Sequence, residues 1–333
     1  MARAFVTGAT GFIGYHVARM LRERGFDVRA LAREGSDTGL LRAIDVEIAR
    51  GDLRDYEGLR TVMKGSERVF HVAADYRLWV PDPRTMYDIN VRGTVNVMKG
   101  AREAGASKVV YTSTVGVLAP PKNGTPGNEE TPARLRDMVG HYKKSKFLAE
   151  QEVKRFVREG CPVVIVNPTA PIGTMDRKPT PTGRIIVDFL NGKMPAYLDT
   201  GLNFVDVEDV AEGHLKASES GVVGERYILG NINLTLKQFL EVLSRLTGKR
   251  PPRWKLPYAP VLCAALIDEG LSRLVTGREP LIPLTGVRMA RHYMFFDCSK
   301  ARAQLGMAQK SLEIAARKAI DWYRGNGYVQ RGL

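Results

Sequence analysis

The sequence predicts an α/β protein with a Rossmann-type, doubly wound parallel sheet and a smaller C-terminal lobe. Over the first 167 residues, short β-rich runs alternate with helical stretches, which is the pattern of successive βαβ units. A glycine-rich turn separates the first of these runs from the first helix. From residue 168 onward prolines cluster and the alternation becomes irregular, which indicates that a second lobe begins there.

The expected elements follow one another closely along the chain. The first strand covers residues 2–7, and the apolar spacing that follows predicts a helix that stops at Gly25. Residues 168–333 are expected to form mainly a substrate-binding lobe, but 203–230 would return to the first sheet through runs at 205–207 and 226–229. The run 119–132 is rich in Pro, Gly and Asn and predicts a mobile loop. Further strands are expected at residues 28–32, 46–48, 69–73, 109–111 and 162–166.

Length and composition exclude several classes of protein. The chain has 333 residues, of which 44% are hydrophobic and 26% charged, so disorder, collagen and disulfide scaffolds are excluded. The apolar run 261–267 is far shorter than the ~20 residues of a membrane-spanning helix. Cys161, Cys263 and Cys298 lie far apart, and the five histidines show no metal-binding spacing. We therefore expect a reduced, cytoplasmic protein without a metal, in which a strand at the start leaves no room for a leader.

The formal net charge of +14 also needs an explanation. A nucleic acid, an anionic membrane surface or a phosphorylated ligand would each account for it, and so would solubility alone. Basic residues are spread along the chain without a basic arm or a nucleic-acid-binding motif, so we expect no nucleic-acid partner. The run 258–267, continued by Leu271, Leu274 and Val275, predicts an amphipathic or buried helix. Such a helix could wall an apolar pocket, make peripheral contact with a membrane, or belong to the core.

The turn at residues 7–14 (TGATGFIG) carries glycine at every third position. Gly8 allows the chain to turn, Gly11 lets backbone N–H groups approach a pyrophosphate, and Gly14 lets the helix pack closely on the sheet. The positive end of the helix would face the phosphates. The turn therefore predicts a dinucleotide site, and the alternative is a tight turn that binds nothing.

The end of the second strand distinguishes NAD from NADP. An acidic residue there binds the ribose 2′-hydroxyl, whereas an arginine suits a 2′-phosphate. Ala32 occupies the position of the acid and Arg33 follows it, so we favour NADP(H) over NAD(H). The alternative is that Arg33 is solvated and Glu34 holds the ribose. Asp52, after the third strand, could accept a hydrogen bond from the adenine amino group or could cap a helix.

Tyr142 and Lys146 are four residues apart and would share one face of a helix. A nearby ammonium can lower the pKa of a phenol from its usual value near 10, so the pair could perform acid/base catalysis. The alternative is a solvated helix face. The run 110–114 (VYTST) ends a strand with hydroxyl groups, at the edge where doubly wound folds bind ligands. A hydroxyl at that edge could therefore hold a substrate carbonyl beside the phenol, and the alternative is that Thr and Ser are simply common at strand ends.

Together these motifs resemble the extended short-chain dehydrogenase/reductase family, which includes NAD-dependent epimerases and dehydratases and dihydroflavonol 4-reductase-like enzymes. The resemblance spans essentially the whole chain and rests on 7–14, 51–55 (GDLRD), 71–74 (HVAA), 90–94 (NVRGT), 111–114 (YTST) and 142–146 (YKKSK). It implies that Tyr142 is the catalytic acid/base, that Lys146 lowers its pKa, and that Thr114 and Asn90 complete the catalytic set. It also implies cofactor contacts from Gly8, Thr10, Gly11, Phe12, Ile13, Gly14, Arg33, Asp52, Leu53, Ala73, Ala74, Thr112, Tyr142, Lys146, Asn167, Pro168 and Thr169.

Within this family, the segments 74–79, 138–146, 178–184 and 194–203 resemble bacterial hopanoid-associated sugar epimerases, named largely for their genomic association with hopanoid lipid synthesis. Nucleotide-sugar epimerases usually carry an acid where this chain has Ala32, so the departure favours an NADP(H)-dependent reductase or dehydrogenase. The resemblance implies a sugar- or polyol-like substrate, or a polar lipid head group. Loop packing on the core is the alternative role of the residues expected to bind it, which are Tyr76, Arg77, Trp79, Lys178, Arg184 and Tyr197.

These expectations combine into hydride transfer between nicotinamide C4 and a carbonyl or alcohol carbon, with Tyr142 handling the proton. An epimerase or dehydratase that retains its cofactor is the first alternative. A non-catalytic NADP(H)-sensing protein is the second, although such relatives have usually lost the Tyr/Lys pair, which is present here. The family resemblance also implies a homodimer formed through the helices at 90–104 and 142–158.

Overall fold

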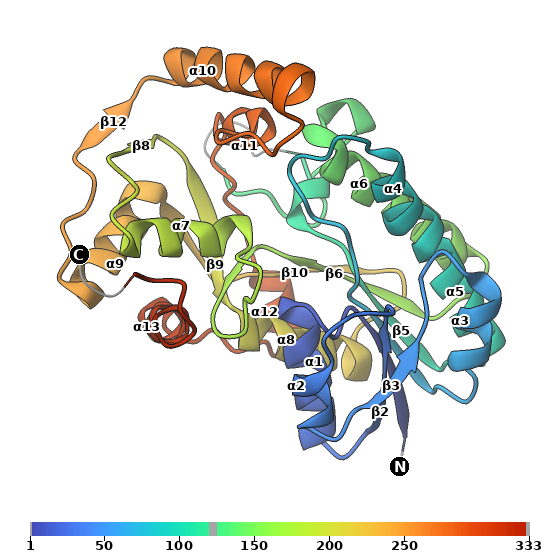
Figure 1. The fold of residues 1–333 in the computed structure, drawn as a ribbon. Coiled ribbons are helices and arrows are strands. Elements are labelled where there is room, and N and C mark those ends of the chain that lie inside the picture. Colours follow the sequence, from blue (N-terminus) through green and yellow to red (C-terminus); the bar gives the residue numbers. More distant parts are fainter. Residues whose placement is uncertain (1, 120–124, 331–333) are drawn as a thin grey trace.

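The computed structural model describes residues 2–119 and 125–330, so part of the expected loop at 119–132 lies outside the described residues. Its centre is a seven-stranded parallel sheet in the order β10-β6-β5-β4-β1-β2-β3 (Figure 1). This confirms the predicted fold class. The strands are β1 (Arg3–Thr7), β2 (Asp27–Ala32), β3 (Glu47–Arg50), β4 (Arg68–His71), β5 (Lys108–Thr112), β6 (Val163–Pro168) and β10 (Arg226–Leu229).

Helices cover both faces of this sheet, which is why its central strands β1, β4, β5 and β6 are almost entirely buried. In β1, Ala4 and Val6 pack into the core cluster shared with one helical layer, whereas Phe5 points into the cluster on the other side. The first layer contains α1 (Phe12–Glu23) and α8 (Val207–Ser220), and the second contains α3 (Tyr56–Val62), α5 (Gly93–Glu103) and α6 (Gly140–Arg158). Short helices α2 (Gly39–Arg42), α4 (Arg84–Tyr87), η1 (Asp88–Arg92), η2 (Val115–Val117) and η3 (Leu135–Asp137) lie in the connections.

The remaining elements build a second hydrophobic cluster beside the carboxyl ends of the large sheet. Phe204 and Phe239 stack there with ring centres 4.1 Å apart. A three-stranded sheet contains β7 (Ala170–Ile172), β9 (Gly201–Asp206) and β11 (Ile232–Thr235), and β8 (Ala196–Leu198) pairs with β12 (Trp254–Leu256). The helices are α7 (Pro181–Leu190), α9 (Leu236–Thr247), α10 (Tyr258–Leu271), η4 (Ser272–Thr276), α11 (Leu284–Met289), α12 (Ser299–Leu305) and α13 (Leu312–Gly325).

Of the two runs expected to return to the large sheet, only 226–229 does so, as β10 beside β6. The prediction for 205–207 is wrong, because Val205 and Asp206 end β9 in the three-stranded sheet and Val207 begins α8. The carboxylate of Asp206 accepts a hydrogen bond from the Glu208 backbone N–H at 2.8 Å. This cap ends the strand and starts the helix. Likewise the strand expected at 69–73 ends earlier, at His71.

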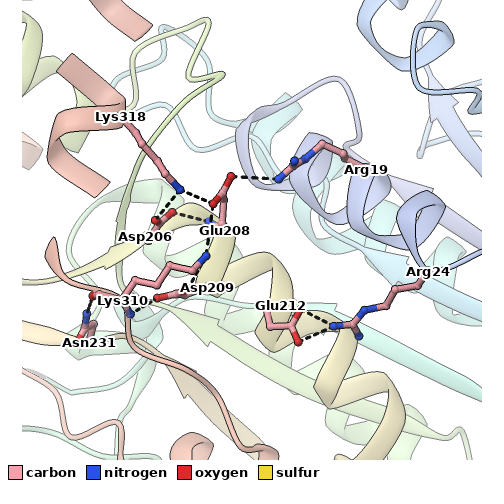
Figure 2. Close-up of polar contacts among 9 residues, drawn as sticks. All are labelled: Arg19, Arg24, Asp206, Glu208, Asp209, Glu212, Asn231, Lys310 and Lys318. Carbon is pink, nitrogen blue, oxygen red and sulfur yellow. Dashed lines mark hydrogen bonds and ion pairs between the residues drawn. The ribbon is translucent and has the colours of Figure 1, made fainter. Parts of the chain in front are cut away.

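A cluster of charges at the start of α8 connects the two parts of the molecule (Figure 2). Glu208 pairs with Arg19 of α1 at 3.1 Å and with Lys318 of α13 at 2.6 Å, and Lys310 lies 3.5 Å away. Burial raises the pKa of Glu208, but the three cations outweigh it and lower the pKa to about 2. Asp206 also faces Lys318, at 3.7 Å. The second lobe is thus attached through α8 to the helix that follows the glycine turn.

The expected helix at 258–267 is α10, which lies at the outer edge of the molecule above α11 (Figure 1). Only Ala265 and Glu269 of its residues are buried. The interpretation of this helix as core is therefore wrong. Among the described residues, no helix is both long enough and apolar enough to cross a membrane.

Candidate active site

A cavity of about 520 Å³ opens where β1, β4, β5 and β6 end, and the second lobe closes its other side. Carboxyl ends of parallel strands are the usual ligand edge of this kind of sheet. The cavity brings together most of the residues that the sequence predicts to bind the cofactor. Those in its lining are Gly8, Thr10, Gly11, Phe12, Ile13, Gly14, Ala73, Ala74, Thr112, Tyr142, Lys146, Pro168 and Thr169.

The glycine turn has the geometry that a dinucleotide pyrophosphate requires. Gly8 has a φ of +76°, and a Cβ there would come within 2.6 Å of the Ala73 backbone nitrogen. A Cβ on Gly14 would lie 2.1 Å from the Gly8 carbonyl oxygen, so helix and strand can approach only without side chains. Gly11 provides no side-chain cap for α1, whose first N–H groups remain available at the cavity. These residues therefore fit the cofactor predicted for them.

Arg33, Asp52 and Leu53 lie outside the cavity lining, at the ends of β2 and β3. The exposed Arg33 accepts a hydrogen bond at its backbone oxygen from the Arg50 guanidinium, at 2.8 Å. Asp52 is held by Arg54 at 2.7 Å, and this hydrogen bond, with a smaller contribution from the charge of Arg33, lowers the pKa of the carboxyl. The Arg50 guanidinium thus lies at the backbone of Arg33, the residue that follows Ala32.

Sequence reasoning missed Arg50 because it placed the end of β3 at residue 48. The strand continues to Arg50, which is paired in register with Ala32. The parallel order of the strands could have identified Arg50, because the last residue of one strand then lies beside the last residue of the neighbouring strand.

The predicted catalytic residues come together in the cavity. The side chains of Thr114 and Tyr142 are hydrogen-bonded to each other. Burial raises the pKa of Tyr142 to about 12, although the hydrogen bond from Thr114 opposes the rise. The Lys146 ammonium donates to the Thr112 carbonyl oxygen at 2.7 Å, and burial lowers its pKa to about 7. Thr114 thus opposes the effect of burial on the phenol, and the action of Lys146 on the pKa of Tyr142 stays a prediction.

Glu150 of α6 interacts with Lys146 and with Ser113, the residue before Thr114, and sequence reasoning missed it as well. It is buried, accepts a hydrogen bond from the Ser113 hydroxyl at 2.5 Å, and opposes the burial effect on Lys146 by raising that pKa. The signal was its spacing, because positions 142, 146 and 150 lie on one helical face.

Asn90 and Asn167 act through other residues. Asn90 accepts from the Asp75 backbone N–H at 2.8 Å and donates to the Ser145 hydroxyl at 2.9 Å, so it joins the loop after β4 to α6. Asn167 donates to the Thr114 carbonyl oxygen at 3.0 Å. Neither residue is in the cavity lining, and both hold segments that carry catalytic side chains.

The residues expected to bind substrate are not brought together. Only Tyr76 of the six lines the cavity, and its hydroxyl donates to the Lys178 carbonyl oxygen at 3.3 Å. Arg77 turns back to pair with Asp75. The side of the cavity formed by the second lobe is mainly apolar, with contributions from Ile185, Leu202, Phe204, Leu236, Met289 and Met294, and Leu78 of the loop after β4 adds to it.

The only charged side chains in the lining, among the residues described, are Lys143 and Lys146. Lys143 is buried, and no hydrogen-bond or ion-pair partner for its ammonium is found among these residues. Burial lowers the pKa of Lys143 to about 8. Sequence reasoning missed it because two adjacent lysines on a helix are typical of a solvated face.

Comparison with known proteins identifies the family. Residues 4–230 match the profile of the NAD dependent epimerase/dehydratase family. The chain is 42% identical to a dihydroflavonol 4-reductase-like protein of Synechocystis sp. (98% of this chain, 96% of the relative). It is 35% identical to sterol demethylase protein B of Methylococcus capsulatus (97% and 99%).

A solved structure has the same fold. The crystal structure of gox2253 is 46% identical and superposes with a TM-score of 0.88, over 99% of this chain and 100% of that chain. The chain therefore belongs to the NAD-dependent epimerase/dehydratase family and is an enzyme of the extended short-chain dehydrogenase/reductase type.

Proposed function

We propose that this enzyme is an NADP(H)-dependent oxidoreductase that interconverts a carbonyl and an alcohol on a substrate with a largely apolar body. The observation that carries the proposal is the hydrogen-bonded pair Tyr142 and Thr114 in a cavity that extends from the glycine turn into the apolar second lobe. Residues 1–167 would hold the cofactor, and residues 168–333 would mainly enclose the substrate.

In the reducing direction, Tyr142 donates its phenolic proton to the carbonyl oxygen, which Thr114 orients. A phenol with a pKa raised to about 12 by burial is protonated at neutral pH and ready to act as an acid. When bound, the reduced nicotinamide supplies hydride to the carbonyl carbon. Lys146 would hold the nicotinamide ribose and, when charged, stabilise the phenolate that remains. In the oxidising direction Tyr142 accepts the proton of the alcohol.

The preference for NADP(H) is supported by the two guanidinium groups at the end of β2 and β3. Arg33 and Arg50 are both exposed, and Arg50 is hydrogen-bonded to the Arg33 backbone. A ribose 2′-phosphate would be recognised by such a pair, because guanidinium groups bind phosphate oxygens in a bidentate manner.

The choice between a sugar and an apolar substrate rests on the cavity. Arg77, Lys178 and Arg184, which the sequence offered for a sugar, are absent from the lining, and Asn203 is the amide side chain that the described residues of the second lobe contribute to it. The apolar side chains of α7, β9 and α11 favour a ring system or lipid that carries a ketone or alcohol. Several relatives carry names of reductases or dehydrogenases of such molecules, including a sterol-4-alpha-carboxylate 3-dehydrogenase from Mus musculus. A hopanoid-linked alcohol or ketone belongs to this class.

The first experiment identifies the cofactor and then tests turnover. The purified protein is denatured, any released nucleotide is identified by mass spectrometry, and the apo form is titrated with NADPH and NADH. We expect an empty protein that binds NADPH more tightly and oxidises it in the presence of hydrophobic ketones. NAD that survives purification in stoichiometric amount would instead indicate an epimerase. Tight NADPH binding without turnover across the ketone panel would indicate a sensor.

We also propose a homodimer that works in the cytoplasm, formed through the surfaces of α5 and α6. Each helix carries a half-buried apolar side chain, Val95 on α5 and Phe147 on α6, which a partner chain could cover further. Light scattering on the purified protein should give twice the chain mass of 36.9 kDa. A monomer at micromolar concentration would contradict the proposal.

A further inference from the structure

An exposed apolar face lies on the outer side of the molecule, far from the sheet (Figure 1). It belongs to α10, η4 and the loop that leads to α11, residues 258–283, which we call the outer segment. Ile267, Leu271 and Leu274 follow one another at intervals of four and three, so they project from one side of the helix. The large apolar side chains exposed here are Leu266, Ile267, Leu271, Leu274 (88%), Val275 (74%), Leu281 (92%) and Ile282.

The acidic groups of the outer segment are largely used inside the protein. The Asp268 carboxylate accepts a hydrogen bond from the Ile282 backbone N–H at 2.7 Å. Glu269 is buried and accepts from the Leu284 backbone N–H at 3.2 Å and from Arg273 at 2.8 Å. These contacts attach the loop to the helix. Leu281, which lies in this loop, is exposed to solvent. The apolar face is therefore built into the fold.

The outer segment itself carries two arginines and three acidic residues, and the basic excess lies in the residues that flank it, 249–257 and 284–291. Between residues 249 and 291 the chain has eight lysines and arginines against three acidic residues. Arg273 and Arg278 are exposed on the outer segment, and Arg253, Trp254 and Lys255 are exposed on the strand that leads into it. A helix with exposed leucines, flanking cations and an exposed tryptophan has the character of a segment that lies in a lipid interface.

We propose that the outer segment docks the enzyme on the surface of an anionic lipid bilayer. Charge favours a bilayer over a second copy of this face, because a second copy would bring the basic flanks of two chains together, whereas anionic head groups neutralise them. The α10 helix has 14 residues and is too short to span a bilayer, so it lies in the interface.

Docking has a consequence for the cavity. The α11 helix packs beneath α10, and its Gly286, Met289 and Ala290 belong to the cavity lining. The substrate side of the cavity would therefore be separated from the bilayer by a single helical layer. This arrangement suits an apolar substrate, but the docking proposal does not depend on the proposed reaction.

The test is cosedimentation of the full chain with vesicles of phosphatidylcholine alone or mixed with phosphatidylglycerol. We expect binding to the mixed vesicles that falls as salt is added, and little binding to the neutral ones. The double variant Leu274→Glu with Val275→Glu should bind the mixed vesicles roughly tenfold more weakly or worse. Val222→Glu with Val223→Glu is the matched control, because it places the same charges on exposed valines in the connection between α8 and β10.

NADPH titration of both double variants distinguishes loss of docking from loss of folding, since none of these residues lies in the cavity lining. Equal binding of the two variants to mixed vesicles, with NADPH binding intact, would overturn the proposal. So would a wild-type protein that fails to bind the mixed vesicles or binds both kinds equally.

Discussion

At the residue scale, Tyr142 has an environment that keeps its phenol protonated without cofactor. Burial raises its pKa to about 12, and Thr114 is the group that opposes this. We predict that Tyr142→Phe keeps its affinity for NADPH and loses ~10²-fold or more in turnover, because only the proton donor is removed. Fluorescence titration and NADPH oxidation measure the two quantities. Tyr87→Phe is the control, since that phenol contacts His141 outside the cavity lining. A Tyr142→Phe variant that keeps the wild-type turnover would contradict the assignment of Tyr142 as the proton donor.

Lys143 gives a prediction about substrate preference. An unpartnered ammonium in an apolar cavity should bind a carboxylate or another acceptor near the reacting carbon. Lys143→Met should lower the preference for a keto acid over its methyl ester by about tenfold. Lys144→Met is the control, since that neighbour is absent from the lining.

The same preference should depend on pH. Because burial lowers the pKa of Lys143 to about 8, the ammonium is charged below that pH and neutral above it. The wild-type preference for the acid should therefore decline as pH rises through about 8, and the variant should show no such decline. A variant with the wild-type pH profile would show that Lys143 does not meet the substrate.

Arg33 and Arg50 should discriminate between the two cofactors. We predict that Arg33→Ala and Arg50→Ala each weaken NADPH binding by about tenfold and change NADH binding little, since only NADPH carries the 2′-phosphate. Titration of both cofactors measures this, and Arg42→Ala removes an equivalent charge from nearby α2 as a control. Equal effects on the two cofactors would reject the recognition of the phosphate.

Residues whose role depends on local spacing were predictable from the sequence. The glycine turn needs only its own neighbours, and Tyr142 and Lys146 need only one helix. Arg50 and Glu150 were not predicted, because their roles come from strand register and from a partner on another element, Ser113. Lys143 was missed for the same reason, since its side chain lies beside Gly116 of η2, which is another element.

At the scale of elements, the strands buried on both faces were predicted well and the short strands of the second lobe were not. The run 163–168 is buried throughout because helices cover both sides of the sheet. The run 205–207 is also buried, but the strands that pair with β9 are β7 and β11, which have three and four residues. Nothing in so short a run specifies which sheet it joins.

The charge cluster at the start of α8 predicts a pH-dependent contribution to stability. The folded pKa of Glu208, about 2, is below its ordinary 4.5, so the contribution is present above pH 4.5 and is lost as pH falls toward 2. Glu208→Gln should lower the melting temperature at pH 7 by about 1–3 °C. The difference in melting temperature between this variant and the wild type should narrow below pH 4.5. Glu219→Gln, which removes a more exposed partner of Arg24, is the control. A gap that is unchanged at low pH would contradict the prediction.

At the scale of the whole molecule, the sequence predicted the class of fold and the edge of the sheet that binds ligands. It did not predict the outward position of α10, because the same run of apolar residues is compatible with a buried helix and with an exposed one. Its exposure becomes visible only when the packing beneath it is known, and α11 supplies that packing.

The return of β10 to the edge of the large sheet has a consequence for synthesis. A nascent chain can build six strands as soon as residue 168 has emerged, but β6 then presents an unpaired edge until residues 226–229 arrive beside it. The 57 residues between β6 and β10 include β9, which belongs to the three-stranded sheet. Part of the second lobe must therefore be synthesised before the large sheet is complete. A fragment that stops at residue 167 should therefore aggregate, and one that continues to residue 230 should be markedly more soluble.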